Sequence, residues 1–481
     1  MTYLIVPATL LYAIASMLLL LYGINCYIMI YFSLLKKRSE DIKVDPDIDL
    51  PTVTIQLPIY NERNVSERVI RAAASLDYPI DKLEIQVLDD SNDETVSIVD
   101  RVVEELRGKG IDINAIRRPD RQGFKAGALA YGISSAKGEF LAVFDSDFVP
   151  GSDFLRRTIP VFMRDSKAAF VQTRWGHLNR RESVLTRCQA LGIDGHFLVE
   201  QPARSKGGLF MNFNGTAGIW RKAAIVDAGG WSDATLTEDL DLSYRVQLAG
   251  WKPYYMSDVI VPAELPLTMA ALKNQQFRWA KGSMQTALLV LPRVWRGPYS
   301  FLKKTEAFLH LTNYVVHPMM LVMALLALPM LLFGLVRIPP WVFTIASLPL
   351  LVSTFGPSSM YIVAMARLSE RRIGSFLWMP VLVVYGTGIA VSNSVAIFEA
   401  IAGKTSSFVR TPKKGESRSS GYRLGKNKIW AFEVLLGAYS ICSVAAAVVS
   451  GNYGILPFLA IFAVGFLTVG IRTAVGSTRD A

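Results

Sequence analysis

The chain is poor in cysteine and histidine, the residues that most often build disulfide frameworks and transition-metal sites. Only three cysteines occur, Cys26, Cys188 and Cys442; two of them lie in apolar runs and none has the spacing of a metal site. This argues against a disulfide framework and indicates a reducing compartment. The histidines lie outside the acidic motifs described below: His177, His196, His310 and His317.

The first 35 residues lack charged side chains altogether, and the first charges appear at Lys36, Lys37 and Arg38. A cleaved signal peptide would carry positive charge before a shorter apolar core. We therefore expect an uncleaved transmembrane anchor over residues 1–35. The basic residues after it predict that its C-terminal end faces the cytoplasm.

Composition restricts the class of protein. Hydrophobic residues make up 51% of the 481-residue chain and include several long uncharged runs, yet the middle of the chain is charged. This combination fits a membrane enzyme, channel or transporter with a substantial aqueous domain. The net charge is +11, but eight basic residues crowd one stretch near position 410, beside a membrane run. That placement favours an anionic substrate or lipid headgroups and argues against nucleic acid.

Residues 50–265 have the pattern of an α/β domain. The β-rich runs VTIQLP, EIQVLDD, INAI, LAVFD and AAFVQT are separated by helical patterns such as 63–76 and 94–107. Such alternation predicts βαβ units and a mostly parallel sheet, with ligands at the carboxyl ends of the strands. Polar side chains follow three of the predicted strands: Tyr60, Asn61 and Glu62, then Asp89 and Asp90, then Asp145 and Asp147.

The pair Asp145 and Asp147 ends the apolar run LAVF. Alternate side chains of a strand share a face, so both carboxylates point the same way. Mg²⁺ usually binds one or two carboxylates plus substrate phosphates, so the pair predicts a metal–nucleotide site. A solvated turn is the alternative interpretation. Three acidic strand ends at one sheet edge require cations, and Arg121 and Lys125 supply two of them.

Two motifs further along could serve an acceptor. FNGTAG, which contains Gly215 and Thr216, is a small-residue turn where a ligand can lie against the backbone. TED places Glu238 and Asp239 at the start of a helical pattern, with Thr237 before them. Helix capping is the simpler interpretation of TED. The functional interpretation is a general base, which a sugar hydroxyl needs in order to attack an anomeric carbon.

A helical stretch at QQFRW brings Gln275, Arg278 and Trp279 together just before the apolar runs resume. A guanidinium binds phosphate oxygens in bidentate fashion, and an indole suits the apolar face of a sugar ring. The alternative is an interfacial helix with Trp and Arg at headgroup level. The two interpretations are compatible, and we expect interfacial helices over residues 266–304.

The ordered set VLDDS, DSD, TED and QQFRW resembles the processive inverting glycosyltransferases of family 2, the group of cellulose, hyaluronan and chitin synthases. FNGTAG before TED is most similar to the cellulose synthase-like proteins that make mannan, glucomannan or β-glucan backbones. The resemblance covers residues 52–279. It implies a GT-A catalytic domain and a divalent cation, Mg²⁺ or Mn²⁺.

The resemblance also implies roles for individual residues. Those expected to bind the donor's base, ribose and diphosphate are Tyr60, Glu62, Asp89, Asp90 and Lys125. Asp145 and Asp147 would engage the diphosphate and the metal. Asp239, with Glu238 beside it, would deprotonate the acceptor, and Arg278 would steady the departing diphosphate. The residues expected at the acceptor are Gly215, Thr216, Gln275 and Trp279.

Four later apolar runs predict transmembrane helices, two within 305–366 (309–336 and 341–366) and two within 429–473 (429–450 and 455–471). The basic segments 367–372 and 404–428 should both be cytoplasmic. The run 376–401, within 373–402, therefore cannot cross once, and it is too short to cross twice. We expect it to be interfacial or re-entrant, which makes five spanning helices. The alternative is a sixth crossing with basic residues outside.

The basic segment 403–428 contains Phe408, Thr411 and Lys413, which resemble the gating loop of cellulose synthases. Arg410 stands where that family has Val. In the family this loop folds over the nucleotide, and Lys413 near a diphosphate is also reasonable on charge alone. A polybasic loop that binds lipid is the alternative, and it does not exclude the first role.

Together these patterns predict a multi-pass enzyme of the plasma or inner membrane with a cytoplasmic catalytic domain. It would polymerise a β-linked polysaccharide from UDP-glucose or GDP-mannose and export it through its own helices. The expected partners are the donor, the growing glycan, membrane lipids and accessory export subunits. One alternative is a non-processive glycosyltransferase with a membrane lipid acceptor. A transporter or channel with a nucleotide-binding domain is disfavoured, because the membrane runs hold few charged residues.

Overall fold

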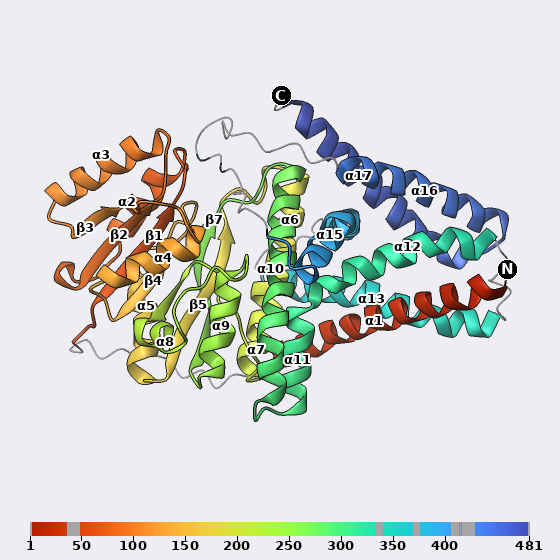
Figure 1. The fold of residues 1–481 in the computed structure, drawn as a ribbon, viewed down its shortest axis with the longest axis horizontal. Coiled ribbons are helices and arrows are strands. Elements are labelled where there is room, and N and C mark those ends of the chain that lie inside the picture. The colour runs from red at the N-terminus through yellow and green to blue at the C-terminus, as the bar shows by residue number, and fades with distance from the viewer. Residues whose placement is uncertain are drawn as a thin grey trace.

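The computed structural model describes residues 2–35, 49–332, 340–368, 376–405, 413, 415 and 429–479. A domain built on one β-sheet lies beside a bundle of long helices, and helix α10 (Met269–Arg296) stands between the two parts (Figure 1). The chain enters the sheet domain from the bundle through α1 (Thr2–Leu34) and returns to the bundle after α10.

The sheet has seven strands in the order β3-β2-β1-β4-β6-β5-β7. The pairs β1–β2, β2–β3, β1–β4 and β5–β7 are parallel, and β6 is antiparallel to both β4 and β5. The prediction of an α/β domain with a mostly parallel sheet is confirmed. The strands are β1 (Val53–Ile59), β2 (Leu83–Asp89), β3 (Ile113–Ile116), β4 (Phe140–Val143), β5 (Ala168–His177), β6 (Gly218–Arg221) and β7 (Lys252–Ala263).

Helices cover both faces of the sheet and bury two apolar clusters. One face packs on α2 (Ser66–Ala74), α3 (Thr95–Gly108) and α5 (Phe154–Arg164), and the other on α4 (Phe124–Ser135) and α9 (Glu238–Leu248). Helix α3 packs on the sheet through an apolar stripe. This stripe consists of residues at helical spacing, all buried: Val99, Val102, Val103 and Leu106. The helices predicted at 63–76 and 94–107 correspond to α2 and α3.

Polar residues inside the central strands bond across the sheet. Gln56 of β1 donates from Nε2 to Gln86 Oε1 of β2 at 3.0 Å, and Thr54 donates to the Glu84 carboxylate at 2.6 Å. Both strands are buried almost throughout, as expected for parallel strands covered on both faces. These bonds pair the Thr54 hydroxyl and the Gln56 amide nitrogen, which would otherwise be costly to bury.

The antiparallel strand β6 decides what lies at the end of β4. Because β6 runs in the opposite direction, its first residue Gly218 pairs with Val143, the last residue of β4. The FNGTAG turn that precedes β6 therefore meets the DSD motif that follows β4. Thr216 Oγ1 accepts a hydrogen bond from the Asp145 amide at 2.8 Å. Sequence periodicity had not identified β6 or β7 as strands.

The remaining helices of the sheet domain and its junction follow in chain order. They are α6 (Val184–Gly195), α7 (Gln201–Lys206), α8 (Lys222–Asp227) and α11 (Phe301–Leu311). A π-helical turn, His196–Glu200, joins α6 to α7.

Within the described residues, four helical segments are long and apolar enough to cross a membrane: Pro7–Leu34, Asn313–Leu332, Ile429–Val449 and Tyr453–Val475. They belong to α1, α12 (Val316–Leu332), α16 (Ile429–Val449) and α17 (Leu456–Arg479). These segments overlap four of the five predicted spans. The fifth, at 341–366, corresponds to α13 (Pro340–Arg367), a 28-residue helix, and its crossing of a membrane stays a prediction.

Helix α13 lies against α1 (Figure 1). Gly23 of α1 has no room for a side chain, since a Cβ there would lie 2.6 Å from Ser353 Cα of α13. Small residues let two helices approach this closely, as is common in membrane bundles.

The run predicted to be interfacial or re-entrant forms two helices, α14 (Trp378–Gly388) and α15 (Ala390–Ile401). They are bent by 43° at the break between them. Such a bend suits either a broken span or a re-entrant segment. The predicted topology of this region stays a prediction.

Candidate active site

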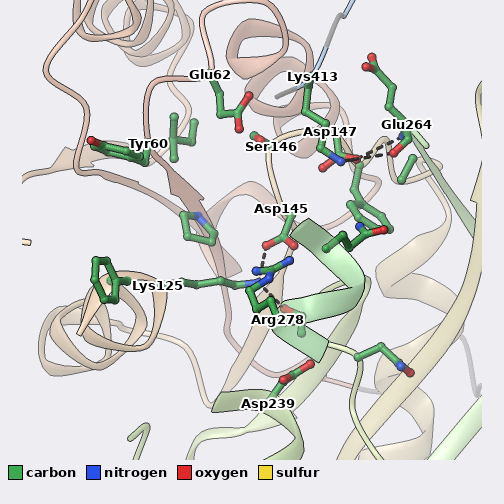
Figure 2. Close-up of a pocket in the computed structure, with 18 of the residues that line it drawn as sticks. Tyr60, Glu62, Lys125, Asp145, Ser146, Asp147, Asp239, Glu264, Arg278 and Lys413 are labelled. Atoms are coloured by element: carbon green, nitrogen blue, oxygen red, sulfur yellow. Dashed lines mark hydrogen bonds and ion pairs between the residues drawn. The ribbon is translucent and has the colours of Figure 1, made fainter. Parts of the chain in front are cut away.

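A pocket lies at the carboxyl ends of β1, β2 and β4, and residues of α10 also line it. Figure 2 shows the side chains that surround this pocket. It brings together side chains from every motif that the sequence analysis identified. The predicted site residues that line it are Tyr60, Glu62, Asp90, Lys125, Asp145, Asp147, Gly215, Glu238, Asp239, Gln275, Arg278, Trp279 and Lys413. Residues as far apart in the chain as Tyr60 and Lys413 thus form one site.

The loops after β1 and β2 hold each other in place at one end of this pocket. Asn61 has a left-handed backbone, with φ of 54°, and its amide donates to Ser91 Oγ at 2.8 Å. Its side chain donates to Asn92 Oδ1 at 2.8 Å and accepts from the Asn92 amide at 2.9 Å. The neighbouring Tyr60 carries the Arg121 guanidinium over its ring, 3.4 Å from the centroid. This wall thus offers flat groups on which a nucleobase can stack.

The adjacent acids Asp89 and Asp90 have different environments. Asp89 is buried and does not line the pocket, since its carboxylate accepts from Arg117 Nε at 2.9 Å and from the Ser91 amide at 3.0 Å. Asp90 lines the pocket and accepts from Arg118 Nε at 2.9 Å. These contacts support Asp89 as a residue that shapes the loop, whereas Asp90 can reach a ligand.

Sequence reasoning missed the two arginines that bind these acids. Arg118 also donates to the carbonyls of Gln122 at 2.7 Å and Phe124 at 3.0 Å, so it ties the loop before α4 to the end of β2. The available signal was the basic pair directly after the predicted strand INAI, opposite the acidic pair of VLDD.

Lys125, on the first turn of α4, neutralises the first acid of the DSD motif. Its ammonium donates to the Asp145 carboxylate and to the Gly215 carbonyl, the latter at 2.9 Å, and lies 3.9 Å from Glu238 (Figure 2). Burial by itself would lower the pKa of Lys125. The negative charges of Asp145 and Glu238 outweigh this effect, so the pKa of Lys125 is raised above its ordinary value. Lys125 therefore stays cationic and connects DSD, FNGTAG and TED.

The second acid of the motif, Asp147, is bound by a lysine from far along the chain. Lys413 Nζ lies 2.7 Å from Asp147 Oδ2 and 3.3 Å from the Glu264 carbonyl (Figure 2). Burial raises the pKa of Asp147 despite the charge of Lys413. Phe408 and Thr411, predicted to belong to the same loop, lie outside the described residues.

Glu264 is a pocket residue that the sequence analysis did not identify. Its amide donates to Asp147 Oδ2 at 3.2 Å, and its carboxylate accepts from Arg68 at 2.7 Å and from the Gly415 amide at 3.2 Å. Glu264 directly follows β7, as Asp145 and Asp147 follow β4. Because β7 was not predicted as a strand, this acid was not recognised as a strand-end residue. The sequence signal, Glu264 after the β-branched run VIVPA, was present but short.

The carboxylates of Asp145 and Asp147 fit a divalent cation only together with substrate oxygens. Within the described part of the chain there is no group of three or more His, Cys, Asp or Glu side chains that could hold a metal ion. The two acids share one pocket and now accept from lysine ammonium groups. Two carboxylates completed by phosphate oxygens and water are a usual Mg²⁺ environment.

Asp239 lies at the start of α9 in a setting suited to a general base. Burial and the adjacent Glu238 raise its pKa from 3.8 to about 7, against the opposing charges of Lys125 and Arg278. Gly215 faces it, and a Cβ at that glycine would lie 3.0 Å from Asp239 Oδ2, so only glycine leaves the carboxylate open here. Thr237 precedes the helix, but its side chain makes no capping hydrogen bond. A base with a pKa near neutrality can both accept and release a proton.

The residues predicted to contact the acceptor come from α10 and FNGTAG. Gln275, Arg278 and Trp279 line the pocket from one side of α10. Thr216 does not line the pocket, because it is buried beneath Gly215 and bonded to Asp145. His177, outside the motifs in sequence, also lines the pocket and bonds to Asp194 at 3.1 Å.

Comparison with known proteins identifies the families that this chain resembles. The family described as "Glycosyltransferase like family 2" matches residues 51–282. A probable glucomannan 4-beta-mannosyltransferase 11 of Oryza sativa subsp. japonica is 49% identical over 236 residues, which cover 48% of this chain and 41% of that protein. Glucomannan 4-beta-mannosyltransferase 2 of Arabidopsis thaliana is 36% identical over 404 residues, covering 80% of this chain and 73% of that one.

A solved structure shares the fold. The mannosyltransferase PcManGT from Pyrobaculum calidifontis, in complex with GDP-Man and Mn²⁺, has a TM-score of 0.52 and 21% sequence identity to this chain. The likeness covers 75% of this chain and all of that one. At this level of identity it supports the GT-A architecture of the sheet domain.

Proposed function

Because this chain belongs to glycosyltransferase family 2, in its cellulose synthase-like group, we propose that it extends a β-linked mannan or glucomannan chain with mannosyl groups from GDP-mannose. The relatives named as glucomannan 4-beta-mannosyltransferases support this donor and product over UDP-glucose. The observation that carries the proposal is Asp239, a carboxylate with a pKa of about 7 in one pocket with Arg278, Trp279 and Lys125.

The reaction is a single displacement at the anomeric carbon. The acceptor hydroxyl oxygen attacks that carbon, the bond from the carbon to the diphosphate oxygen breaks, and the configuration inverts. Asp239 takes the hydroxyl proton, and the diphosphate leaves with the bonding electron pair. Arg278 and Lys125, which line the same pocket, would stabilise the negative charge that develops on the leaving group.

Donor binding uses the opposite end of the pocket. Tyr60 and Arg121 would hold the base, and Glu62 and Asp90 the ribose hydroxyls. Asp145 and Asp147 would hold Mg²⁺ or Mn²⁺, which when bound neutralises diphosphate charge. Lys413 would then be released from Asp147 toward the diphosphate.

The proposal includes a membrane setting. Among the described residues, four helical segments are long and apolar enough to span a membrane, and the basic segments between them support a cytoplasmic catalytic domain. The acceptor end of the pocket is formed by α10, which stands beside the helix bundle (Figure 1). A growing glycan would therefore leave the site toward the membrane helices.

The test is a donor panel. Purified protein in detergent is incubated with Mg²⁺ or Mn²⁺ and radiolabelled GDP-mannose, UDP-glucose or other nucleotide sugars, and the product is sized and digested with linkage-specific hydrolases. We expect a polymer from GDP-mannose that β-mannanase degrades. A short lipid-linked product would instead indicate a non-processive enzyme, and a polymer from UDP-glucose alone would overturn the donor assignment.

A further inference from the structure

Helix α10 has two opposite faces with different partners. Successive residues of a helix turn by about 100°, so Gln275, Arg278, Trp279 and Gly282 fall on one side, and Lys273, Phe277, Lys281 and Met284 on the other. The first side lines the pocket and contacts the start of α9. The second side packs on the membrane-side helices. Any rotation of α10 about its axis would therefore move Arg278 and Trp279 in the pocket.

The pocket side of α10 is also joined to the catalytic base. A Cβ at Gly282 would lie 2.5 Å from Thr237 Cγ2, so the backbone of α10 touches the residue just before α9. The Leu236 amide donates to Gln285 Oε1 at 3.0 Å, and the hydroxyls of Thr237 and Thr286 lie 3.4 Å apart. The position of α10 thus affects both Asp239 and the residues that serve the leaving group and acceptor.

The side of α10 that faces away from the pocket makes an apolar contact with α15. Ala280, Met284 and Ala287 pack against Ala396, Ile397 and Ala400. Four of these six side chains are alanines, which offer few polar or interlocking groups to fix the rotation of one helix on the other.

Two ion pairs accompany this apolar contact, one from α10 to α15 and one from α10 to α16. Lys281 of α10 lies 2.8 Å from Glu399 of α15, with no solvent exposure of the lysine side chain. Lys273, two turns earlier, lies 2.6 Å from Glu433 of α16, with exposures of 5% and 0% for the two side chains. Neither pair touches the pocket.

Three of these four charged groups are buried, and Glu399 is 26% exposed. Burying charged groups is costly, and well-packed apolar residues would stabilise the contact equally well or better. The best attested benefit of buried polar pairs is that they select one register among several similar ones. We infer that the pairs Lys281–Glu399 and Lys273–Glu433 are positioning groups: they fix the rotation of α10 on the membrane helices and thereby hold Arg278, Trp279 and Asp239 in register for transfer. This assignment of catalytic consequence rests on the proposed function.

The decisive variants replace each pair by apolar residues, Lys281→Met/Glu399→Leu and Lys273→Met/Glu433→Leu, so that no buried charge is left unpaired. The control is Lys137→Met/Asp112→Leu, an ion pair between more exposed side chains far from α10. All are made in the full chain. The measurements are thermal midpoint, transfer rate, KM for GDP-mannose, and amide hydrogen exchange of the peptide that contains Leu236.

We expect both α10 variants to keep their thermal midpoint and donor KM while kcat falls by about tenfold to a hundredfold, the cost of a displacement of about 1 Å at a reacting centre. The Leu236 amide should exchange faster, since its bond to Gln285 depends on the rotation of α10. The control variant should match the parent protein in every measurement.

The inference is overturned if the apolar variants transfer sugar at the parental rate with unchanged exchange at Leu236. It is equally overturned if exchange rises throughout the chain together with a lower midpoint, because the pairs would then serve stability alone. If the parent protein transfers no sugar from any donor but exchange at Leu236 still rises selectively, the proposed function fails and the positioning role of the two pairs stands.

Discussion

Lys413 Nζ and Asp147 Oδ2 lie 2.7 Å apart, although the two residues are separated by 266 positions. The contact joins the basic segment after α15 to the acid that follows β4. Both side chains are largely buried, with exposures of 13% and 5%. The lysine thus supplies a positive charge at a carboxylate that we propose to bind a metal ion, and under that proposal donor binding would rearrange this pair.

Lys413→Met should weaken donor binding. Loss of one charged hydrogen-bond donor to a diphosphate costs about tenfold in affinity. We therefore expect the KM for GDP-mannose to rise by about that factor with a smaller change in kcat. The exposed Lys404→Met is the matched control. An unchanged KM for GDP-mannose in the Lys413 variant would contradict this prediction. It would show that Lys413 pairs with Asp147 in the donor-free protein but does not contribute to donor binding.

Asp239→Asn should abolish transfer and leave nucleotide binding nearly intact. The amide cannot accept the acceptor proton, and loss of a general base costs about a hundredfold or more. Transfer is measured with radiolabelled donor and binding by calorimetry with GDP. The exposed Asp258→Asn is the control. A variant at Asp239 that still turns over would remove this residue from the base role.

The rate of transfer should depend on pH through Asp239. Its pKa is raised to about 7, and the base acts only when deprotonated, so kcat/KM should fall about tenfold per unit below pH 7 and level off above it. The free energy of unfolding should change with pH in the opposite direction to the rate. The folded protein holds this proton more tightly than the unfolded chain, so the contribution of Asp239 to folding declines as the pH rises from about 4 to 7. A pH–rate profile with no inflection near 7 would contradict this assignment.

Trp279→Ala should shorten the product and leave donor binding unchanged. The indole lines the pocket at the end that we propose to hold the acceptor, and stacking on a sugar face would be lost with it. We expect normal GDP binding with short oligosaccharides in place of polymer, measured by gel filtration of labelled product. Trp251→Ala, remote from the pocket, is the control. Polymer of parental length from the Trp279 variant would show that the indole serves only as an interfacial anchor.

Much of this site could be predicted because its motifs are local. LAVFDSD places two acids at a strand end through alternation alone, and the order of VLDDS, DSD, TED and QQFRW is readable without coordinates. Asp89 shows the limit of such reasoning, since an acid beside a pocket residue turned out to be bound by Arg117 beneath the loop. Glu264 shows a second limit. The apolar pattern of β7 is too irregular to predict the strand, so the acid that follows it could not be identified as a strand-end residue.

The sequence by itself determined the class of domain, the apolar helices and most of the charged residues of the pocket, because hydrophobic periodicity and strand-end acids are properties of neighbouring residues. Only the tertiary structure decided that β6 is antiparallel, that Lys125 and Lys413 bind the two acids of DSD, and that Asp239 has a pKa near 7. These features depend on burial and on distances between segments remote in the chain. Desolvation and Coulomb energies follow from those distances, which no local pattern encodes.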